Sequence, residues 1–222
     1  MKTDAQLKLD VSNELEWEPS INATNVGVAV KNGVVTLTGH LDTYAEKYAI
    51  ERAVQRVQGV KAVAVELDVK LALDHKRSDS EIAAAAESAF TWHGMIPEEH
   101  VRVKVEKGWV TLSGEVDWEY QRRSAYSAVR PLIGVVGVTN NITLKPQITP
   151  AQVTNRIRDA LARQAEREAK NVEVMVSGAK VTLRGKVHSW AERAAVQGAA
   201  WAAPGITQVV NELVVEPWSG RT

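Results

Sequence analysis

The stretch that decides the fold is VTLTG at residues 35–39, which recurs as VTLSG at 110–114 and as VTLRG at 181–185. Each copy ends in a glycine, and a second glycine follows 20 residues later in all three copies. The copies begin 75 and then 71 residues apart, and the apolar positions around them keep the same offsets. Self-similarity of this kind indicates a tandem repeat. The paired glycines are Gly39, Gly114 and Gly185, followed by Gly59, Gly134 and Gly205.

The repeat sets the domain organisation of the 222-residue chain. It predicts three small domains at residues 1–72, 77–146 and 149–217, joined by short polar linkers. A domain of about 70 residues buries only about 60% of its unfolded surface, so each would be marginally stable alone. Some mutual support between the domains is therefore expected.

The sequence of each unit predicts five secondary-structure elements. Apolar residues at helical spacing open the unit, as in Leu7, Val11 and Leu15. Two alternating runs follow at 26–30 and 34–38 in the first unit, and the Asn-Gly pair at 32–33 between them is a strong hairpin signal. A second helix, with small residues such as Ala49, Ala53 and Val57 on its inward side, is predicted to end at the second glycine of each pair. A last alternating strand closes the unit.

The order α-β-β-α-β determines the expected fold class. The second helix connects strands two and three as a right-handed crossover, which makes those two strands parallel. Two helices then cover one face of a three-stranded mixed sheet. The sequence therefore predicts an α+β protein of three tandem two-layer sandwiches.

Composition excludes several functional classes. The net charge is zero and the pI is about 7, so the chain lacks the basic footprint expected for nucleic-acid binding. It contains no cysteine, which excludes disulfides, thiolate metal sites and cysteine nucleophiles and fits a reducing compartment.

The chain start bears on location. The segment MKTDAQLKLDV lacks the apolar core of a signal peptide and has the pattern of an amphipathic helix. No run approaches the roughly 20 apolar residues that span a bilayer. If the chain begins at its natural start, we expect a cytoplasmic protein without a transmembrane segment.

The repeated unit resembles a known family. V-x-L-x-G on the second strand, a helix and then G-V-x-x-V-x-N-x-L-x-V is similar to the BON domain (bacterial OsmY and nodulation). The third unit matches best, at residues 205–213, and the resemblance covers nearly the whole chain as three copies. It implies non-enzymatic modules that are associated with osmotic and envelope stress and attach to phospholipid surfaces or proteins. Family members are often exported, and this chain departs from them by lacking an export signal.

The residues that could suggest chemistry favour structural roles. The glycines form no phosphate-binding motif and are interpreted as backbone positions. Asn140 and Asn211 fall on the core-facing side of the last strand, where they either contact a ligand or cation or bond neighbouring backbone groups, the latter being expected. The histidines show no metal-ligand spacing, and no nucleophile or base repeats between units. We therefore expect no catalytic residues, no cofactor and no bound transition metal.

Tryptophan is over-represented, with seven tryptophans against one phenylalanine. Trp109 lies on the second strand with parity opposite to Val110 and Leu112, so it should project from the face away from the core. The candidate partner or inter-domain surface comprises Trp92, Trp109, Trp118 and Trp190. They either pack between units or anchor an external partner or lipid headgroup. We expect at least one to lie at a contact between units.

The sequence thus favours a stress-associated protein that binds a phospholipid membrane surface or other proteins through multivalent weak contacts. The alternative is a sensor of a small ligand or monovalent cation, with the site between units.

Overall fold

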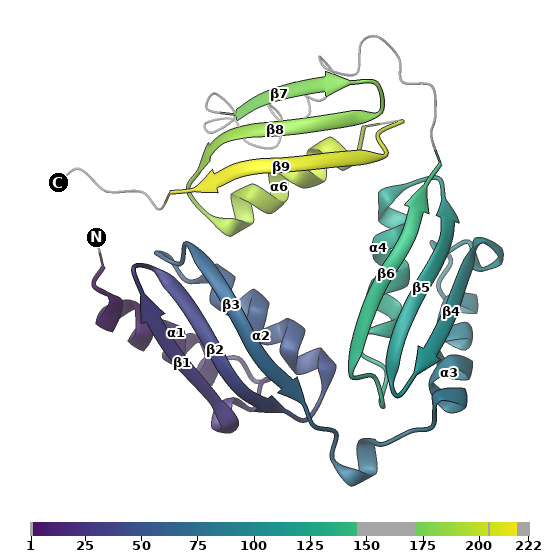
Figure 1. Ribbon diagram of the computed structural model, residues 1–222, viewed down its shortest axis with the longest axis horizontal. Helices are drawn as coiled ribbons and strands as arrows, with labels where there is room; N and C mark the ends of the chain where they lie inside the picture. Colours follow the sequence, from purple (N-terminus) through teal and green to yellow (C-terminus); the bar gives the residue numbers. More distant parts are fainter. Residues whose placement is uncertain (1, 146–171, 204, 217–222) are drawn as a thin grey trace. The chain divides into compact units, whose positions relative to one another are not determined.

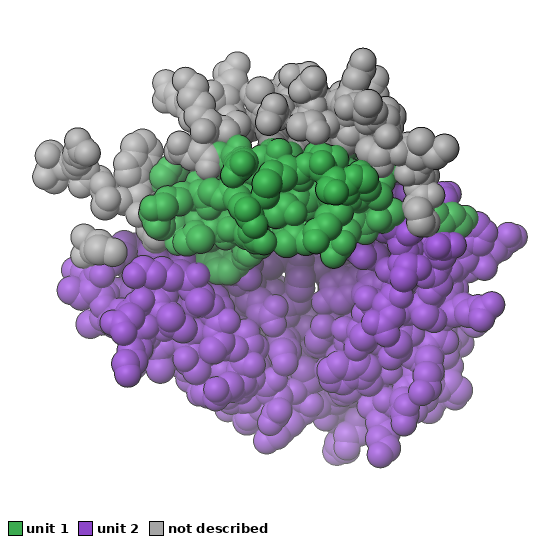
Figure 2. Space-filling view, turned by 45° about the horizontal axis from the view of Figure 1, so that its top comes forward, with its two compact units in different colours: residues 1, 145–222 green, residues 2–144 purple. Residues whose placement is uncertain are grey.

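The structure is a computed structural model, and it describes residues 2–145, 172–203 and 205–216 (Figure 1). The chain divides into two compact units (Figure 2). Residues 2–144 form one unit, which contains the first two repeats, and the unit from residue 145 onward contains the third. The first helix predicted for the third repeat lies outside the described residues.

The described elements follow the predicted order. The first repeat contains α1 (Asp4–Trp17), β1 (Val26–Lys31), β2 (Val34–Leu41), α2 (Tyr44–Arg56) and β3 (Ala62–Val69). The second contains α3 (Asp79–Thr91), β4 (Val101–Glu106), β5 (Trp109–Val116), α4 (Glu119–Val129) and β6 (Gly137–Leu144). The third contains β7 (Val172–Ser177), β8 (Lys180–Val187), α6 (Trp190–Trp201) and β9 (Gln208–Val215).

Each repeat has its own mixed sheet. The strand orders are β1-β2-β3, β4-β5-β6 and β7-β8-β9, with the first pair antiparallel and the second pair parallel in every sheet. In the first two repeats both helices lie on one side of the sheet, and the other face carries no helix of that repeat (Figure 1). The α+β class and the three tandem mixed sheets are confirmed.

In the first two repeats the core lies between the sheet and its two helices, and in the third the described core lies between the sheet and α6. The leucine of the VTL stretch is fully buried in all three repeats, as Leu37, Leu112 and Leu183. Helix α2 turns Ile50, Ala53 and Val54 inward, whereas the expectation of a small-residue stripe placed Ala49, Ala53 and Val57 there. The stripe is therefore rotated by about one position, because the larger Ile50 and Val54 gain more by burial than alanine does.

The first glycine of each pair, which we call the marker glycine, is required by backbone geometry. Gly39, Gly114 and Gly185 have φ angles of +124°, +130° and +129°, a region that side-chain-bearing residues avoid. A Cβ at Gly39 would overlap the carbonyl oxygen of Asn25, and one at Gly114 would overlap that of His100. At this point strand two approaches the chain that enters strand one, so the repeated glycine keeps the antiparallel pair closed.

The second helix of each repeat ends earlier than predicted. Helices α2, α4 and α6 end at Arg56, Val129 and Trp201, three to five residues before the second glycine. The glycines do have positive φ angles, but they lie in the turn after the helix. In the first repeat Val57 already adopts extended geometry, and Val60 is buried. Burial of that valine requires the chain to leave the helix before Gly59.

The hairpin turns of the first two repeats are held by an aspartate of the first helix. Asp4 accepts hydrogen bonds from the backbone N–H groups of Asn32 (2.7 Å) and Gly33 (3.1 Å). Asp79 accepts the equivalent bonds from residues 107 and 108, both at 2.8 Å. The helix itself is capped by the preceding residue, Thr3 or Ser78. The aspartate therefore links helix and hairpin rather than starting the helix.

Candidate functional site

Among the residues that the structure describes, the most exposed tryptophans are Trp17 and Trp92, which are 85% and 87% exposed. Both lie 22 residues before the marker glycine of their repeat, at the C-terminal end of the first helix. Trp17 is the last residue of α1, and Trp92 is the C-cap of α3. Two indoles at one repeat position, both almost fully in solvent, form a paired surface feature. We call it the helix-end tryptophan pair.

Sequence reasoning identified Trp92 but missed Trp17. The signal was available, because the repeat register aligns the two residues. The third repeat has Arg163 at the same offset from its marker glycine. The pair therefore belongs to the first two repeats, which together form one compact unit.

The surface around Trp17 is acidic. Glu14 and Glu18 of this segment both accept hydrogen bonds from the Arg56 side chain at 2.9 Å. This guanidinium holds the pKa of Glu18 below its usual range. A shallow cavity of about 380 Å³ adjoins the indole and is lined by Asp10, Asn13, Glu14, Trp17 and Val57.

A second and larger cavity, of about 620 Å³, adjoins the end of α3. Three carboxylates, Glu87, Glu98 and Glu99, line it together with Arg102. Glu98 accepts a hydrogen bond from the Thr91 hydroxyl at 2.7 Å. The cavity beside Trp17 and the cavity at the end of α3, the helix that Trp92 caps, thus carry more acidic than basic side chains.

The other candidate tryptophans lie elsewhere on their repeats. Trp109 is 49% exposed on the open face of its sheet, and its Nε1–H donates to Thr139 Oγ1 at 2.9 Å. Trp118 is the partly buried N-cap of α4. Trp190 begins α6 and is also partly buried, with the Arg193 guanidinium 5.2 Å from its ring centroid. That one of the four lies at a contact between repeats stays a prediction.

The contact that the structure defines between the first two repeats involves tyrosines and an arginine. The hydroxyls of Tyr44 on α2 and Tyr126 on α4 are 3.0 Å apart. The Arg130 guanidinium lies 3.6 Å from the ring centroid of Tyr48, a cation–π geometry. Burial and the Tyr44 hydroxyl raise the pKa of Tyr126, and burial raises the pKa of Glu51. This contact is polar and aromatic rather than a continuous apolar core.

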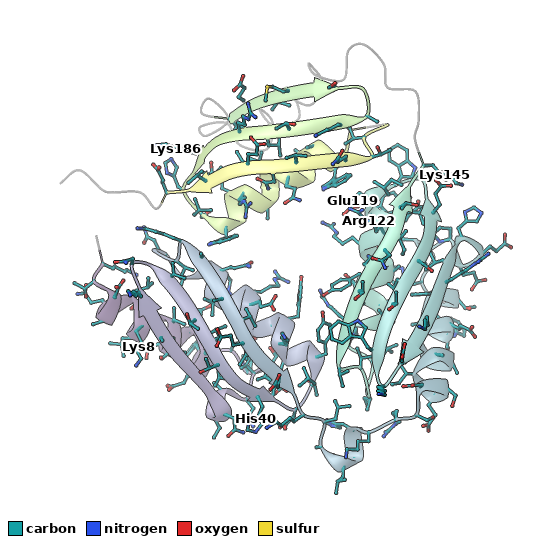
Figure 3. All side chains as sticks on the ribbon, viewed as in Figure 1. Lys8, His40, Glu119, Arg122, Lys145 and Lys186 are labelled. Atoms are coloured by element: carbon teal, nitrogen blue, oxygen red, sulfur yellow. The ribbon has the colours of Figure 1, made fainter. Side chains whose placement is uncertain are left out.

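Helix α4 also carries a partly buried ion pair at its start. Glu119 and Arg122 lie side by side, with Oε2 and Nε 2.6 Å apart (Figure 3). Burial raises the pKa of Glu119, and the hydrogen bond from Arg122 opposes that shift. The pair lies within one helix turn, so it orients the Arg122 side chain along α4.

Both asparagines of the last strand bond to the helix above them. The Asn140 amide donates to the Arg122 carbonyl at 3.0 Å, and its oxygen accepts from Ile142 N–H at 3.1 Å. The Asn211 amide donates to Gln197 Oε1 at 3.1 Å. The Asn140 partners are backbone groups, whereas Asn211 bonds the Gln197 side chain and the Leu213 N–H, and the structural role of both asparagines stays a prediction.

The described ranges contain no cluster of three or more histidine, cysteine, aspartate or glutamate side chains placed to hold a metal ion. Within them, no helix has the length and apolar character needed to cross a membrane. The cytoplasmic location stays a prediction.

Comparison with known proteins gave three kinds of match. The family model described as BON domain matches residues 3–70, 78–146 and 150–217. A curated relative, the osmotically-inducible protein Y of Escherichia coli (strain K12), is 27% identical over 146 residues, covering 64% of this chain and 73% of the relative. Among solved structures, CdsD, a structural protein of the type III secretion system of Chlamydia trachomatis, aligns at 18% identity over 95% of this chain and 92% of that chain, with a TM-score of 0.27.

Proposed function

The chain belongs to the BON domain family, and we propose that it is a non-enzymatic protein of the osmotic stress response that binds phospholipid surfaces through the helix-end tryptophan pair. The stress association is supported by the similarity to the osmotically-inducible relative. Membrane binding is supported by one observation above all, the near-complete exposure of Trp17 and Trp92 at the same repeat position. An indole has an apolar body and a polar N–H, which suits the headgroup layer of a bilayer.

Two anchors in one compact unit make weak binding effective. Each indole contributes little when it acts alone, but the second anchor binds at a high effective concentration once the first is inserted. The first two repeats carry one anchor each, which gives a reason for the tandem arrangement. A third repeat with arginine at this position contributes in a different way or not at all.

The acidic surroundings select the kind of membrane. The carboxylates beside Trp17 and at the end of α3 repel an anionic lipid surface and tolerate a zwitterionic one. We therefore propose that vesicles of phosphatidylcholine bind better than vesicles enriched in phosphatidylglycerol. Higher salt should narrow this difference, because it screens the repulsion between exposed charges.

Vesicle co-sedimentation of the full chain tests the proposal. The double variant Trp17→Ala/Trp92→Ala should bind phosphatidylcholine vesicles about a hundredfold more weakly, corresponding to about tenfold per indole. Leu73→Ala is the matched control, because Leu73 is 86% exposed but lies between the first two repeats. Wild-type and double variant that sediment equally would overturn the membrane proposal.

Experiments on the same chain and its double variant distinguish two other kinds of partner, a protein and a small ligand or cation. A protein partner would be indicated if the double variant binds both kinds of vesicle as the wild type does but loses an interaction that crosslinking detects in cell extract. The alternative function, a sensor of a small ligand or monovalent cation, predicts that K⁺ or Na⁺ raises the unfolding temperature at constant ionic strength, because a ligand that binds only the native state stabilises it.

A further inference from the structure

Trp109 is held flat on the open face of the second sheet. A Cβ at Gly137 would overlap three atoms of the indole ring, so the ring lies directly over that glycine. The bond from Nε1 to Thr139 Oγ1 fixes its rotation. One ring face rests on β6, and nearly half of the side chain stays in solvent. The indole is therefore a preorganised platform.

Only the second repeat has this arrangement. Strand register places Trp109 between Glu106 and Gly137. In the first repeat the same row reads Lys31, Val34 and Ala62, and in the third it reads Ser177, Lys180 and Gln208. Trp109 and Gly137, the glycine that makes room for the indole, thus occur together in one repeat. The stability of the sheet does not require this pair, because the other two sheets form without it.

Uncharged hydrogen-bonding groups extend from the platform along the sheet. The next row contains Thr111 and Thr139, and the row after it contains Ser113 and Asn141. Ser113 and Asn141 are exposed and Thr111 is partly exposed. Because Val110 and Leu112 point to the core, these hydroxyl and amide groups share the face of the indole. They offer both donors and acceptors.

The charges on this face cancel. Arg102 and Lys104 on β4 are balanced by Glu106 and Glu115, and Lys104 lies 3.0 Å from Glu106. Balanced charge gives no attraction to the phosphates of a nucleic acid or of an anionic headgroup. A neutral ligand with a flat apolar ring face and many hydroxyls fits the three observations together.

We propose that the Trp109 face is a binding site for an uncharged saccharide, with one pyranose ring stacked on the indole. The electron-rich face of the indole attracts the C–H groups of the sugar ring. The side chains of Thr111, Ser113 and Asn141 bond the sugar hydroxyls and fix the orientation. This site is separate from the helix-end tryptophan pair and goes beyond the proposed membrane function.

NMR titration of the full chain with maltohexaose and cellohexaose tests the site. The indole N–H signal of Trp109, assigned from a Trp109→Phe variant, should move saturably with a dissociation constant on the order of 1 mM, as for a ligand bound on an open surface. The signal of Trp92 should stay in place. The shifts should be insensitive to salt, because the ligand is neutral.

Three variants make the test decisive. Gly137→Ala keeps the indole but displaces it from the sheet, and it should weaken binding by about tenfold or more. Trp109→Ala should abolish binding, whereas Val34→Ala, in the same row of the first repeat, should leave it unchanged. If Trp109→Ala fails to fold, Gly137→Ala and Thr111→Val supply the comparison. Absence of saturable shifts with both saccharides, or equal shifts in Gly137→Ala, would overturn the proposal.

Discussion

The hairpin turns of the first two repeats and of the third are built differently on the same fold. In the first two, both turn residues have positive φ angles, 54° and 80° at Asn32 and Gly33, and 52° and 77° at Lys107 and Gly108. In the third only Gly178, at 58°, is positive. The first two turns are type I′, and the third has the sign pattern of type II′.

The turn type changes together with a residue far away in sequence. Asp4 and Asp79, which bind the type I′ turns, lie 35 residues before their marker glycines, and the third repeat has Pro150 at that position. Proline offers no side-chain acceptor for backbone N–H groups. The aspartate and the type I′ turn therefore occur together, because the carboxylate binds the N–H groups of that turn. The fold of the third repeat persists without either of them.

The largest expected effect concerns the feature that all repeats share. Gly114→Ala should destabilise the chain by about 3 kcal/mol, because the new methyl group meets a backbone carbonyl and the backbone has positive φ. Thermal unfolding measures the change. Gly94→Ala is the control, since a Cβ there has nothing within 4 Å, and it should be nearly neutral. Equal stability of the two variants would show that the shared glycine is not needed.

The second prediction removes the contact between the aspartate and the type I′ turn in the second repeat. Asp79→Ala removes the acceptor of two 2.8 Å bonds from the turn and should cost about 2 kcal/mol, as expected for hydrogen bonds to a charged group. Urea unfolding measures the loss, and amide exchange at Lys107 and Gly108 should accelerate. Asp74→Ala, at an exposed linker aspartate, is the control. Unchanged exchange at the turn would contradict the role of Asp79.

The two type I′ turns differ in their first positive-φ residue, which is Asn32 in the first repeat and Lys107 in the second. Lys107 has a φ angle of 52°, where lysine is strained and asparagine is tolerated. Lys107→Asn copies the first repeat and should stabilise the chain by about 0.5 kcal/mol. Lys104→Asn, on the adjacent strand, should give no such gain. A loss of stability in Lys107→Asn would mean that the lysine side chain makes a favourable contact.

The smallest effect concerns the contact between the first two repeats. Burial raises the folded-state pKa of Glu51 above its unfolded value, so ionisation of Glu51 lowers stability at pH values above that folded pKa. The third repeat has Gln197 at the equivalent position. Glu51→Gln should therefore raise the unfolding temperature slightly at pH 7. The gain should disappear as the pH falls below the usual carboxyl range, and a gain that persists in acid would contradict the electrostatic cause.

The same difference between repeats appears on the surface. The first two repeats expose tryptophan at the end of the first helix, and the third has arginine at the same offset in the sequence. Divergence at the turn, at the helix end and on the open sheet face leaves the buried leucine and the marker glycine unchanged. Surface positions are therefore free to specialise because they carry little of the folding energy.

The sequence by itself determined the number of repeats, the order of elements and the strand pairing. Local signals carry this information: alternation of apolar residues, an Asn-Gly turn and a glycine at a fixed offset each act within a few residues. The repeat strengthened every signal by showing it three times. For this reason the α+β class and the open sheet face with Trp109 followed from the sequence.

Tertiary structure alone decided where the helices end, what Asp4 and Asp79 bind, and how Trp109 lies over Gly137. Helix α2 stops at Arg56 because Val60 must reach the core, which depends on the depth of the sheet beneath it. The aspartates meet turns 28 and 29 residues away, and the indole meets a glycine on another strand. Contacts between segments far apart in the chain leave no periodic signal in the sequence, because they depend on the packing that brings the segments together.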